Sequence, residues 1–273
     1  MPLRPHLSRH LPALLLWAGM AACAVGLVAH RMWDALPFPR FFEHVLLGML
    51  ALAAAWPLQR WLRWNRASAL CVVWLLALAV FAGPLPMLAV AVLAAAAIAV
   101  GSWVMTGPIA LPIGLAIIAG ALGWLLPLPI HHRATYALAC IALIAWRHRV
   151  IAAACGEAWR RFDDAARAAP RASSAAILLL GLASTGAWLP TMQYDDVVYH
   201  LGLPWQLQET ARYAMDPSLQ VWALAPWAGD VLQGVAQVLA GGEARGALDA
   251  LWLAIAAGAV FALAGALGAD ATR

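Results

Sequence analysis

Charged residues are scarce in this chain of 273 residues, and lysine is absent. Only 11% of the residues are charged, whereas 64% are hydrophobic and the mean hydropathy is +0.80. A soluble domain has roughly a quarter of its residues charged. This chain therefore has too few polar side chains to cover a fold in water, and lipid must form part of its solvent. The composition excludes a soluble protein and predicts an all-α membrane protein built from transmembrane helices.

Several motifs that would point to soluble enzyme classes or to nucleic-acid binding are missing. The sequence contains no Gly-rich phosphate loop, no GxSxG and no HExxH, and its four Cys form no CxxC pair. The basic residues give a pI near 9.2. They lie between apolar runs, where they indicate membrane topology, and no basic patch with interleaved aromatics suggests nucleic acid as a partner.

Long apolar runs recur along the whole chain. A transmembrane helix needs about 20 apolar residues, and on this basis the sequence predicts about eight to nine spans. The eighth predicted span is interrupted by Pro226 and carries Asp230. The predicted spans are Leu11–Ala29, Phe41–Trp56, Ala67–Ala82, Leu85–Met105, Pro108–Leu126, Ala134–Trp146, Ser174–Leu189, Val221–Ala240 and Gly246–Leu267.

The Arg residues predict the orientation of these spans, because cytoplasmic loops carry an excess of positive charge. With the N-terminus in the cytoplasm, twelve Arg fall inside and five outside. The strongest anchor is Arg147–Arg171, which we expect to form a charged amphipathic helix on the cytoplasmic side. Asp163 and Asp164 in this helix could bind a metal, but pairing with Arg one turn away is the favoured interpretation. The first helix is expected to be an uncleaved span rather than a signal peptide.

Two connections on the outer side stand out. The loop at 190–220 is about thirty residues long and rich in aromatic residues with helical spacing, which predicts an ordered amphipathic helix at the outer membrane surface. The short loop His131-His132-Arg133 could supply a pair of ligands. Adjacent His on such a loop more often lie at the membrane interface, which is the interpretation we favour.

The clearest chemical pattern lies in the long outer loop. We call residues Tyr194–Leu201, with the sequence Tyr-Asp-Asp-Val-Val-Tyr-His-Leu, the acidic motif. In a helix, Asp195 and Tyr199 would share one face, and Asp196 and His200 the adjacent face. Two adjacent carboxylates repel each other unless a cation, a basic group or a substrate hydroxyl compensates. One acid could simply stabilise a helix N-terminus, but this role does not explain the Tyr-His step.

The acidic motif resembles the first extracytoplasmic loop of GT-C membrane glycosyltransferases. The similar branch is the bacterial one related to protein O-mannosyltransferases and the lipid A aminoarabinose transferase. Its members carry an acidic pair, a Tyr-His step and, downstream, an aromatic-Pro segment with an acidic residue. Pro204, Glu209 and Arg212 follow the motif here, and Ala225–Asp230 occupies the downstream place. The resemblance covers about residues 174–268.

The resemblance implies transfer of a sugar from a polyprenyl-phosphate carrier to an acceptor hydroxyl on the extracytoplasmic side of the bacterial inner membrane. It implies that Asp195 or Asp196 is the general base, and we assign this role to Asp195 first. It also implies substrate binding by Tyr199, His200, Trp205 and Asp230. A divalent metal ion could be held by Asp196, His200 and Asp230.

These implications divide the chain into two parts. Residues 1–172 are expected to form a bundle of about six spans that ends in the cytoplasmic segment 150–172. Residues 173–273 are expected to be the start of a GT-C-like domain, with the acidic loop and two further spans. Enzymes of this family continue for many more helices, so we expect the chain to be an N-terminal portion or truncated member, or to work with a partner membrane subunit.

Two other function classes fit parts of the sequence. In a transporter, the ionisable Asp230 and Asp249 would mark the transport path. In a non-catalytic scaffold or assembly protein, Trp205, Trp222 and Trp227 would anchor a partner, although an aromatic belt at the membrane surface is the interpretation of these residues that we favour. Membrane lipids are expected partners in every case.

Overall fold

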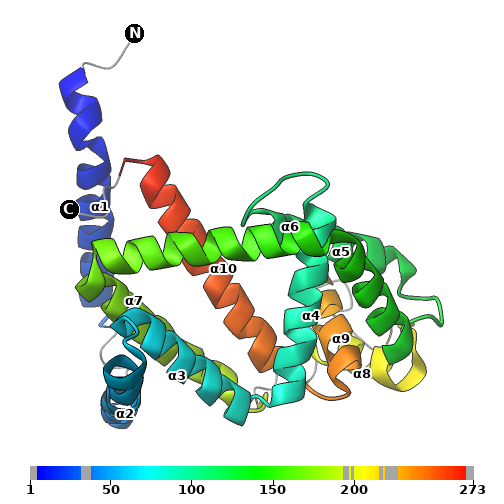
Figure 1. Ribbon diagram of the computed structural model, residues 1–273. Coiled ribbons are helices and arrows are strands. Elements are labelled where there is room, and N and C mark those ends of the chain that lie inside the picture. The colour runs from blue at the N-terminus through cyan, green and yellow to red at the C-terminus, as the bar shows by residue number, and fades with distance from the viewer. Residues whose placement is uncertain are drawn as a thin grey trace.

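The computed structural model describes residues 5–31, 38–192, 197, 200–214, 218 and 227–268. The described elements are all helical, as the composition predicts (Figure 1). They are α1 (Pro5–Ala29), α2 (Phe38–Leu62), α3 (Arg66–Phe81), α4 (Pro84–Gly101), α5 (Ala110–Leu125), α6 (Arg133–Ala168), α7 (Pro170–Ser184), the short 3-10 helix η2 (Thr185–Trp188), α8 (Gly202–Thr210), α9 (Trp227–Ala240) and α10 (Arg245–Ala266).

Within the described part of the chain, four helices are long and apolar enough to cross a membrane. They are Arg40–Leu62 within α2, and α4, α6 and α10. Shorter apolar helices occur at Ala13–Ala29, Arg66–Phe81 and Ala110–Leu125. Many large hydrophobic side chains on these helices are exposed, and Trp124 is 89% exposed. The surface thus matches a lipid solvent, and the fold is that of a helical membrane protein.

Local sequence signals set the junctions between α2, α3 and α4. The side chain of Asn65 accepts a hydrogen bond of 2.8 Å from the backbone N–H of Ser68, which caps the start of α3. Gly83 adopts a φ of +94° between α3 and α4, a conformation that favours glycine. Pro84 then occupies the first turn of α4, where it needs no backbone donor. Gly83 and Pro84 therefore form the turn between α3 and α4.

One group of helices packs α3 between α2 and α7. Its core consists of Ala51, Ala55, Ala69, Leu70 and Trp74. The indole of Trp74 packs directly on Gly181 of α7. The contact is so close that a Cβ at Gly181 would come within 2.0 Å of the ring. Trp188 of η2 lies beside the same indole, with ring centroids 5.9 Å apart. A glycine on α7 and a tryptophan on α3 therefore set the distance between these two helices.

A second group of helices packs around α4. Helix α4 is rich in alanine, and α5, α6, α9 and α10 all contact it. The backbones of α4 and α5 approach closely at two glycines. A Cβ at Gly101 would lie 1.9 Å from the carbonyl oxygen of Ala110, and a Cβ at Gly114 would lie 1.7 Å from that of Ala97. Small residues at helix contacts are the usual means of close packing in membranes.

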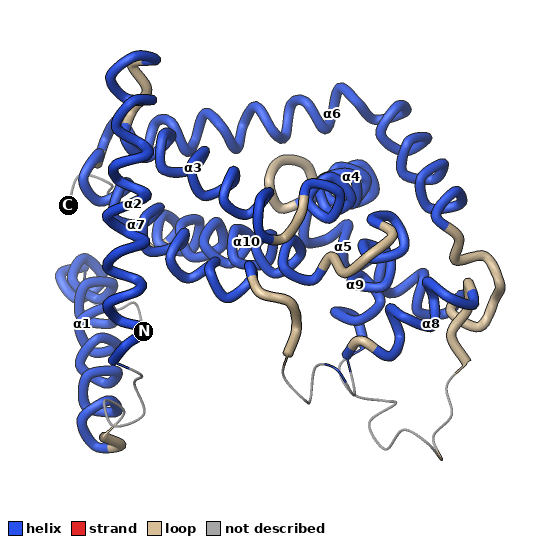
Figure 2. Tube along the Cα trace, turned by 90° about the horizontal axis from the view of Figure 1, so that it is seen from below, coloured by secondary structure: helices blue, strands red, loops and turns tan. Residues whose placement is uncertain are grey.

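Helix α10 lies between the two groups. It contacts α4 and α9 on one side and α7 and η2 on the other. Figures 1 and 2 show the α2, α3 and α7 group on one side of α10 and the α4, α5, α8 and α9 group on the other. Helices from both predicted parts of the chain contribute to each group, because α7 packs on α3 and both α8 and α9 belong to the core around α4.

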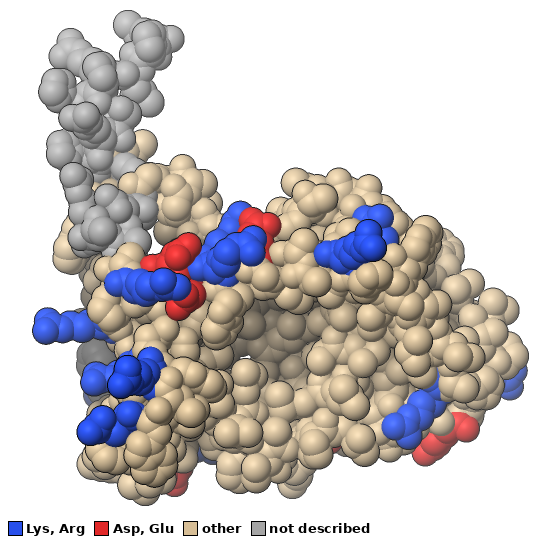
Figure 3. Space-filling view, in the orientation of Figure 1, with Lys and Arg blue, Asp and Glu red and all other residues tan. Residues whose placement is uncertain are grey.

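Helix α6 bends where the predicted span ends and the charged segment begins. The bend is at Arg147, whose φ of −110° and ψ of 18° are not helical. The Arg147 guanidinium donates a hydrogen bond of 2.8 Å to the hydroxyl of Ser102, which caps the C-terminal end of α4. A cation at this end is favoured by the helix dipole. The rest of α6 runs along one side of the molecule, where Figure 3 shows charged side chains gathered.

Ion pairs one turn apart support the charged half of α6. Arg161 pairs with Glu157, and Arg167 pairs with Asp163. Asp163 also accepts a hydrogen bond of 3.4 Å from the side chain of Asn65, at the start of α3. These contacts agree with the favoured interpretation of the acidic residues here as partners of Arg.

The opposite side of the molecule, lower in Figure 1, gathers the ends of several helices. His44 near the start of α2 lies 3.4 Å from the hydroxyl of Thr185 at the end of α7. The start of α10 is pressed against η2, since a Cβ at Gly246 would lie 2.0 Å from the carbonyl oxygen of Ala187. We call this side, which also holds the ends of α3 and α5, the motif face.

The turn between α9 and α10 also lies on the motif face. The hydroxyl of Thr191 donates a hydrogen bond of 2.7 Å to the carboxylate of Glu243 and accepts one of 3.1 Å from Arg245. A Cβ at Gly241 would lie 3.5 Å from the guanidinium of Arg133, at the start of α6. The turn therefore joins the segment after α7 to the loop between α5 and α6.

Helix α9 corrects the predicted eighth span, Val221–Ala240. The helix has only 14 residues, and residues 231–240 are all buried in the protein. Its first turn contacts His200, and its end leads into the turn on the motif face. Helix α9 packs against α8, α4 and α5, and it is not among the described helices that are long and apolar enough to cross a membrane. Helix α10 starts at the motif face, beside η2 and the segment after α7.

The structure also corrects the interfacial placement of His131. His131 is only 1% exposed. Nε2 donates a hydrogen bond of 2.9 Å to the carbonyl of Leu125, which leaves Nδ1 to accept one from the hydroxyl of Tyr136. The backbone N–H of His131 donates to the carbonyl of Ala211. His131 is thus a structural link between α5, α6 and the segment after α8, because both ring nitrogens are used within the protein.

Replacing Tyr136 with Phe is expected to destabilise this link. The change leaves the buried Nδ1 of His131 without its donor, which costs about 1–3 kcal/mol of unfolding free energy. Thermal unfolding of the purified chain in neutral detergent would show a lower midpoint. The control is Trp124→Phe at a lipid-exposed position, which should leave the midpoint unchanged. Equal midpoints for the Tyr136 variant and the native chain would contradict the structural role.

Candidate functional site

The candidate site centres on a contact between two residues that are thirty positions apart. Nδ1 of His200 lies 2.9 Å from Oδ1 of Asp230. The side chain of His200 is 32% exposed and that of Asp230 is 14% exposed. The pair therefore borders the surface of the motif face without being fully open to it. Its two members are the last polar residue of the acidic motif and the downstream acid that the sequence singled out.

Helices α8 and α9 hold this pair in place. His200 lies two residues before α8, and Asp230 lies in the first turn of α9. The two helices pack against each other, and Gln237 of α9 donates a hydrogen bond of 2.9 Å to the side chain of Gln208 on α8. Leu203 and Leu207 form the apolar contact face of α8. The predicted loop at 190–220 therefore contains a helix, α8, whose apolar face packs on α9.

A polar line continues from Asp230 into the protein along α9. Gln233 and Gln237 follow Asp230 at three and seven positions, so the three side chains share one side of the helix. Gln233 is 5% exposed and Gln237 is 1% exposed. Sequence analysis missed both glutamines, because a Gln within an apolar run does not by itself indicate on which side of a helix it lies or what it meets.

The chemistry of the pair follows from its geometry. A carboxylate can only accept, so Nδ1 of His200 carries the proton and Nε2 is the nitrogen left to accept a hydrogen bond from a substrate. Asp230 is favoured as an anion because it lies at the N-terminal end of α9. The contact with Asp230 fixes the tautomer of His200, which is partly exposed. His200 is therefore suited to orienting a polar group of a bound molecule.

Tyr213 is a further residue at the site that sequence analysis did not single out. It is only 4% exposed, and its backbone N–H donates a hydrogen bond of 2.7 Å to the carbonyl of Leu126 at the end of α5. Burial, followed by the nearby Asp230 carboxylate, raises the pKa of the Tyr213 phenol. Tyr213 thus stays neutral and fixes the segment after α8 to the motif face beside Asp230. No local pattern could have placed it there.

The two acids of the acidic motif and its second tyrosine, Asp195, Asp196 and Tyr199, lie outside the described residues. The described residues on either side of them are held on the motif face. Thr191 is bonded to Glu243 and Arg245, and His200 is bonded to Asp230. The roles predicted for the three motif residues stay predictions.

Trp205, a predicted substrate-binding residue, lies on α8. It is 43% exposed, whereas its neighbour Pro204 is buried. The indole therefore lies on the side of α8 that faces away from α9, where a partner or a lipid headgroup could reach it. Its predicted role in substrate binding stays a prediction. The side chains of Trp222 and Trp227 lie outside the described part of the structure.

The predicted metal ligands are Asp196, His200 and Asp230. Among the described residues, no group of three or more His, Cys, Asp or Glu side chains could hold a metal ion. Nδ1 of His200 and Oδ1 of Asp230 bind each other, so these two atoms do not converge on a common point where a cation would lie. The described pair by itself does not fit a divalent metal, and the three-residue ligand set stays a prediction.

No protein-family model, no characterised protein and no solved structure matches this chain.

Proposed function

We propose that the chain is a GT-C-like membrane glycosyltransferase that moves a sugar from a polyprenyl-phosphate donor to an acceptor hydroxyl. The observation that carries the proposal is the 2.9 Å contact between His200 and Asp230. The Tyr-His step and the downstream acid are the two separate elements of the motif resemblance, and the fold brings them together. A chance similarity of two short segments would not require their side chains to meet.

In the proposed reaction, Asp195 accepts the proton of the acceptor hydroxyl, with Asp196 as the alternative base. The hydroxyl oxygen forms a new bond to the anomeric carbon of the sugar. The bond from that carbon to the phosphate oxygen breaks, and the polyprenyl phosphate leaves with the electron pair. His200, oriented by Asp230, binds a polar group of the substrate through Nε2, and Tyr199 and Trp205 contribute to substrate binding.

A divalent metal ion is the proposed cofactor only if Asp196 completes a ligand set with His200 and Asp230. The cation would then help to hold the donor phosphate. The steps given above require only residues of the chain, and none passes through the metal.

The proposed topology places the motif face outside the cytoplasm, in the inner membrane of a bacterium. Helices α1 to α7 and α10 would make eight spans, with the N-terminus inside. Helix α9 would be an extracytoplasmic helix that is buried in the protein. The charged half of α6 would then lie at the cytoplasmic surface, as the excess of Arg there favours. A lipid-linked donor keeps its phosphate at headgroup level, where the motif face would meet it.

Sugar transfer from a lipid-linked donor tests the proposal directly. Membranes that contain the full chain would be incubated with a radiolabelled polyprenyl-phosphate sugar, and release of polyprenyl phosphate would be followed. Membranes without the chain are the control. We expect release that depends on the chain and on an acceptor, and a partner membrane subunit can be supplied by extracts of the native membrane.

A different result would favour another class of protein. Asp230 and Asp249 each have a basic partner, His200 and Arg245 respectively, which gives them local roles on the motif face. If proteoliposomes took up a solute in a manner that required either carboxylate, and no transfer occurred with any donor, the glycosyltransferase proposal would be wrong and a transporter would replace it. Neither transfer nor uptake would leave the scaffold interpretation.

A further inference from the structure

The charged half of α6 carries a row of Arg side chains along one side. Arg149, Arg160 and Arg167 are separated by eleven and seven positions, which places them on the same side of a helix with about 3.6 residues per turn. All three are exposed, and the row extends over about 27 Å. Figure 3 shows basic side chains gathered along this side of the molecule. The row is therefore a long cationic strip on the surface.

The acidic residues of α6 neutralise only part of this strip. Arg167 pairs with Asp163, and Glu157 pairs with Arg161, which lies outside the row. Arg149 and Arg160 form no ion pair with a described residue. A guanidinium without a carboxylate partner keeps its N–H groups available, and it can donate two of them to one phosphate.

The turn between α2 and α3 brings further Arg residues to the same side. The side chain of Asn65 in this turn donates a hydrogen bond of 3.4 Å to Asp163, so the turn lies beside α6. Arg60, Arg63 and Arg66 lie on either side of Asn65, and all three are exposed. Residues 60–66 and 147–171 together contain nine Arg but only three acidic residues. We call the exposed Arg of these two segments the arginine face.

Exposed tryptophans accompany the Arg residues. Trp61 is 76% exposed, Trp64 is 42% exposed and Trp159 is 57% exposed. Trp159 packs on Phe162 with ring centroids 5.6 Å apart, and both rings are turned away from the Arg row by a quarter of a helical turn or more. A helix with a basic side and an aromatic side is typical of the membrane interface, where Trp lies at headgroup level.

The charged half of α6 also joins the two helix groups. Its first residues follow Arg147, which is bonded to Ser102 at the end of α4. Near its end, the carbonyl of Ala165 accepts a hydrogen bond of 3.1 Å from the hydroxyl of Ser173 on α7. Figures 1 and 2 show this half of α6 running crosswise to α4. Where α4 crosses the membrane, the charged half of α6 therefore lies along the membrane surface.

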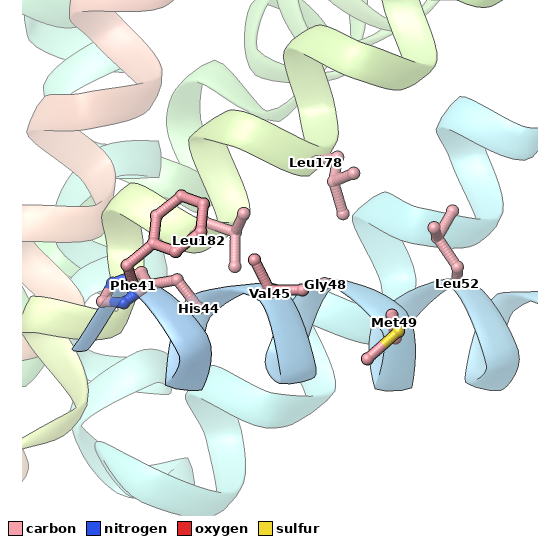
Figure 4. A pocket seen from close by; sticks show the side chains of 8 residues that line it. All are labelled: Phe41, His44, Val45, Gly48, Met49, Leu52, Leu178 and Leu182. Atoms are coloured by element: carbon pink, nitrogen blue, oxygen red, sulfur yellow. The ribbon is translucent and has the colours of Figure 1, made fainter. Parts of the chain in front are cut away.

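The pocket between α2 and α7 does not provide an alternative site for an anion (Figure 4). His44 is the one residue in its lining with a nitrogen or oxygen atom in the side chain. Nδ1 of His44 lies 2.6 Å from the carbonyl oxygen of Arg40, and Nε2 lies 3.4 Å from the hydroxyl of Thr185. Both ring nitrogens are thus used within the protein. The donors for an anion lie on the arginine face instead.

We propose that the arginine face binds the phosphate groups of anionic phospholipids in the leaflet opposite the motif face. Arg149 and Arg160 donate N–H bonds to the phosphate oxygens, and the Arg residues of the turn between α2 and α3 hold neighbouring headgroups. Zwitterionic lipids bind more weakly, because each brings a cation to a strip that is already cationic. The surface is independent of glycosyl transfer, since it uses none of the residues of the candidate site and lies on the other side of the molecule.

Native mass spectrometry of the full chain in neutral detergent tests the surface with phosphatidylglycerol as the probe. Phosphatidylcholine with the same acyl chains is the comparison. We expect phosphatidylglycerol to bind at least tenfold more tightly at low salt, and this preference to shrink as salt screens the exposed charges. Equal affinities for the two lipids would overturn the proposal.

Two substitutions on the Arg row locate the binding. Arg149→Gln together with Arg160→Gln should weaken binding of phosphatidylglycerol about 20-fold, because each Arg near an anionic surface contributes roughly fivefold. The matched control is Arg40→Gln together with Arg212→Gln, which removes the same charge from exposed positions outside the arginine face. It should bind phosphatidylglycerol as the native chain does. Equal losses in the two double variants would show that net charge, and not this surface, attracts the lipid.

Cross-linking in native membranes identifies the occupant of the surface. A photoreactive amino acid in place of Ala153, an exposed residue one turn after Arg149, should cross-link to phospholipid. The exposed position makes the substitution compatible with folding, which the unfolding midpoint of the variant verifies. Cross-links to an acidic protein in place of phospholipid would overturn the proposal and assign the arginine face to a protein partner.

Discussion

Replacing Asp195 with Asn is expected to lower sugar transfer about 100- to 10,000-fold, the range that a positioned general base contributes. Asn keeps the size of the side chain and its ability to accept a hydrogen bond, but it cannot take up the acceptor proton at neutral pH. Asp196→Asn should lower transfer by a similar factor if it is the base, and by a smaller one if it only supports Asp195. The ratio of the two losses therefore assigns the base.

The measurement is the initial rate of polyprenyl phosphate release by each variant at equal protein level. Asp164→Asn is the matched control, because Asp164 is an exposed carboxylate on the opposite side of the molecule, in the charged half of α6. It should transfer sugar at the native rate. Native rates in both the Asp195 and Asp196 variants would remove the acidic motif from the mechanism.

Replacing Gly114 with Ala is expected to cost about 3 kcal/mol of unfolding free energy or more, which is a large effect for one methyl group. The added Cβ would lie 1.7 Å from the carbonyl oxygen of Ala97, and the neighbouring atoms are all backbone of α4. No side chain can turn away to relieve this overlap, so α4 and α5 must separate. Helix α4 is central to the second helix group, and α6, α9 and α10 would lose part of their contact surface with it.

The matched control for this change is on the same helix. Gly120→Ala also adds one methyl group to α5, but a Cβ at Gly120 would meet nothing within 4 Å. This control should be neutral or slightly stabilising, because alanine favours the helix by up to about 1 kcal/mol over glycine. Thermal unfolding and size-exclusion profiles in detergent measure both variants. Similar midpoints for the two would show that the close approach of α4 and α5 is not required for stability.

Local signals in the sequence account for most of the helices. Gly83 and Pro84 end one helix and begin the next through their own backbone preferences, and the structure has the turn where these residues predict it. The charged segment after Arg147 is predicted in the same way, because its Arg and acidic residues one turn apart stabilise a helix that cannot enter lipid. Such features depend on neighbours within about one helical turn.

The error at Val221–Ala240 shows where the local approach stops. An apolar run predicts burial, but it does not distinguish burial in lipid from burial in protein. Asp230 and the side-chain N–H of Gln237 find partners on the segment around α8, and such partners exist only once the chain has folded. The shortness of α9 and its packing on α8 are likewise set by the folded chain and not by the apolar run itself.

The positions of His131 and Tyr213 also depend on residues that are distant in the sequence. His131 was expected at the membrane interface but is buried, because Tyr136 and Leu125 satisfy both of its ring nitrogens. Tyr213 lies beside Asp230 because its backbone is tied to the end of α5, a contact across nearly ninety residues of chain.

The sequence by itself thus determined that this protein belongs to the membrane and that it is helical. Composition and spacing suffice for these conclusions, because hydrophobicity and helix periodicity are local properties. Only the tertiary structure decided that α9 is buried in the protein, and that His200 meets Asp230 on the same face as Thr191 and Glu243. These pairings depend on how distant helices pack, and packing is fixed by steric fit between whole helices rather than by any one segment.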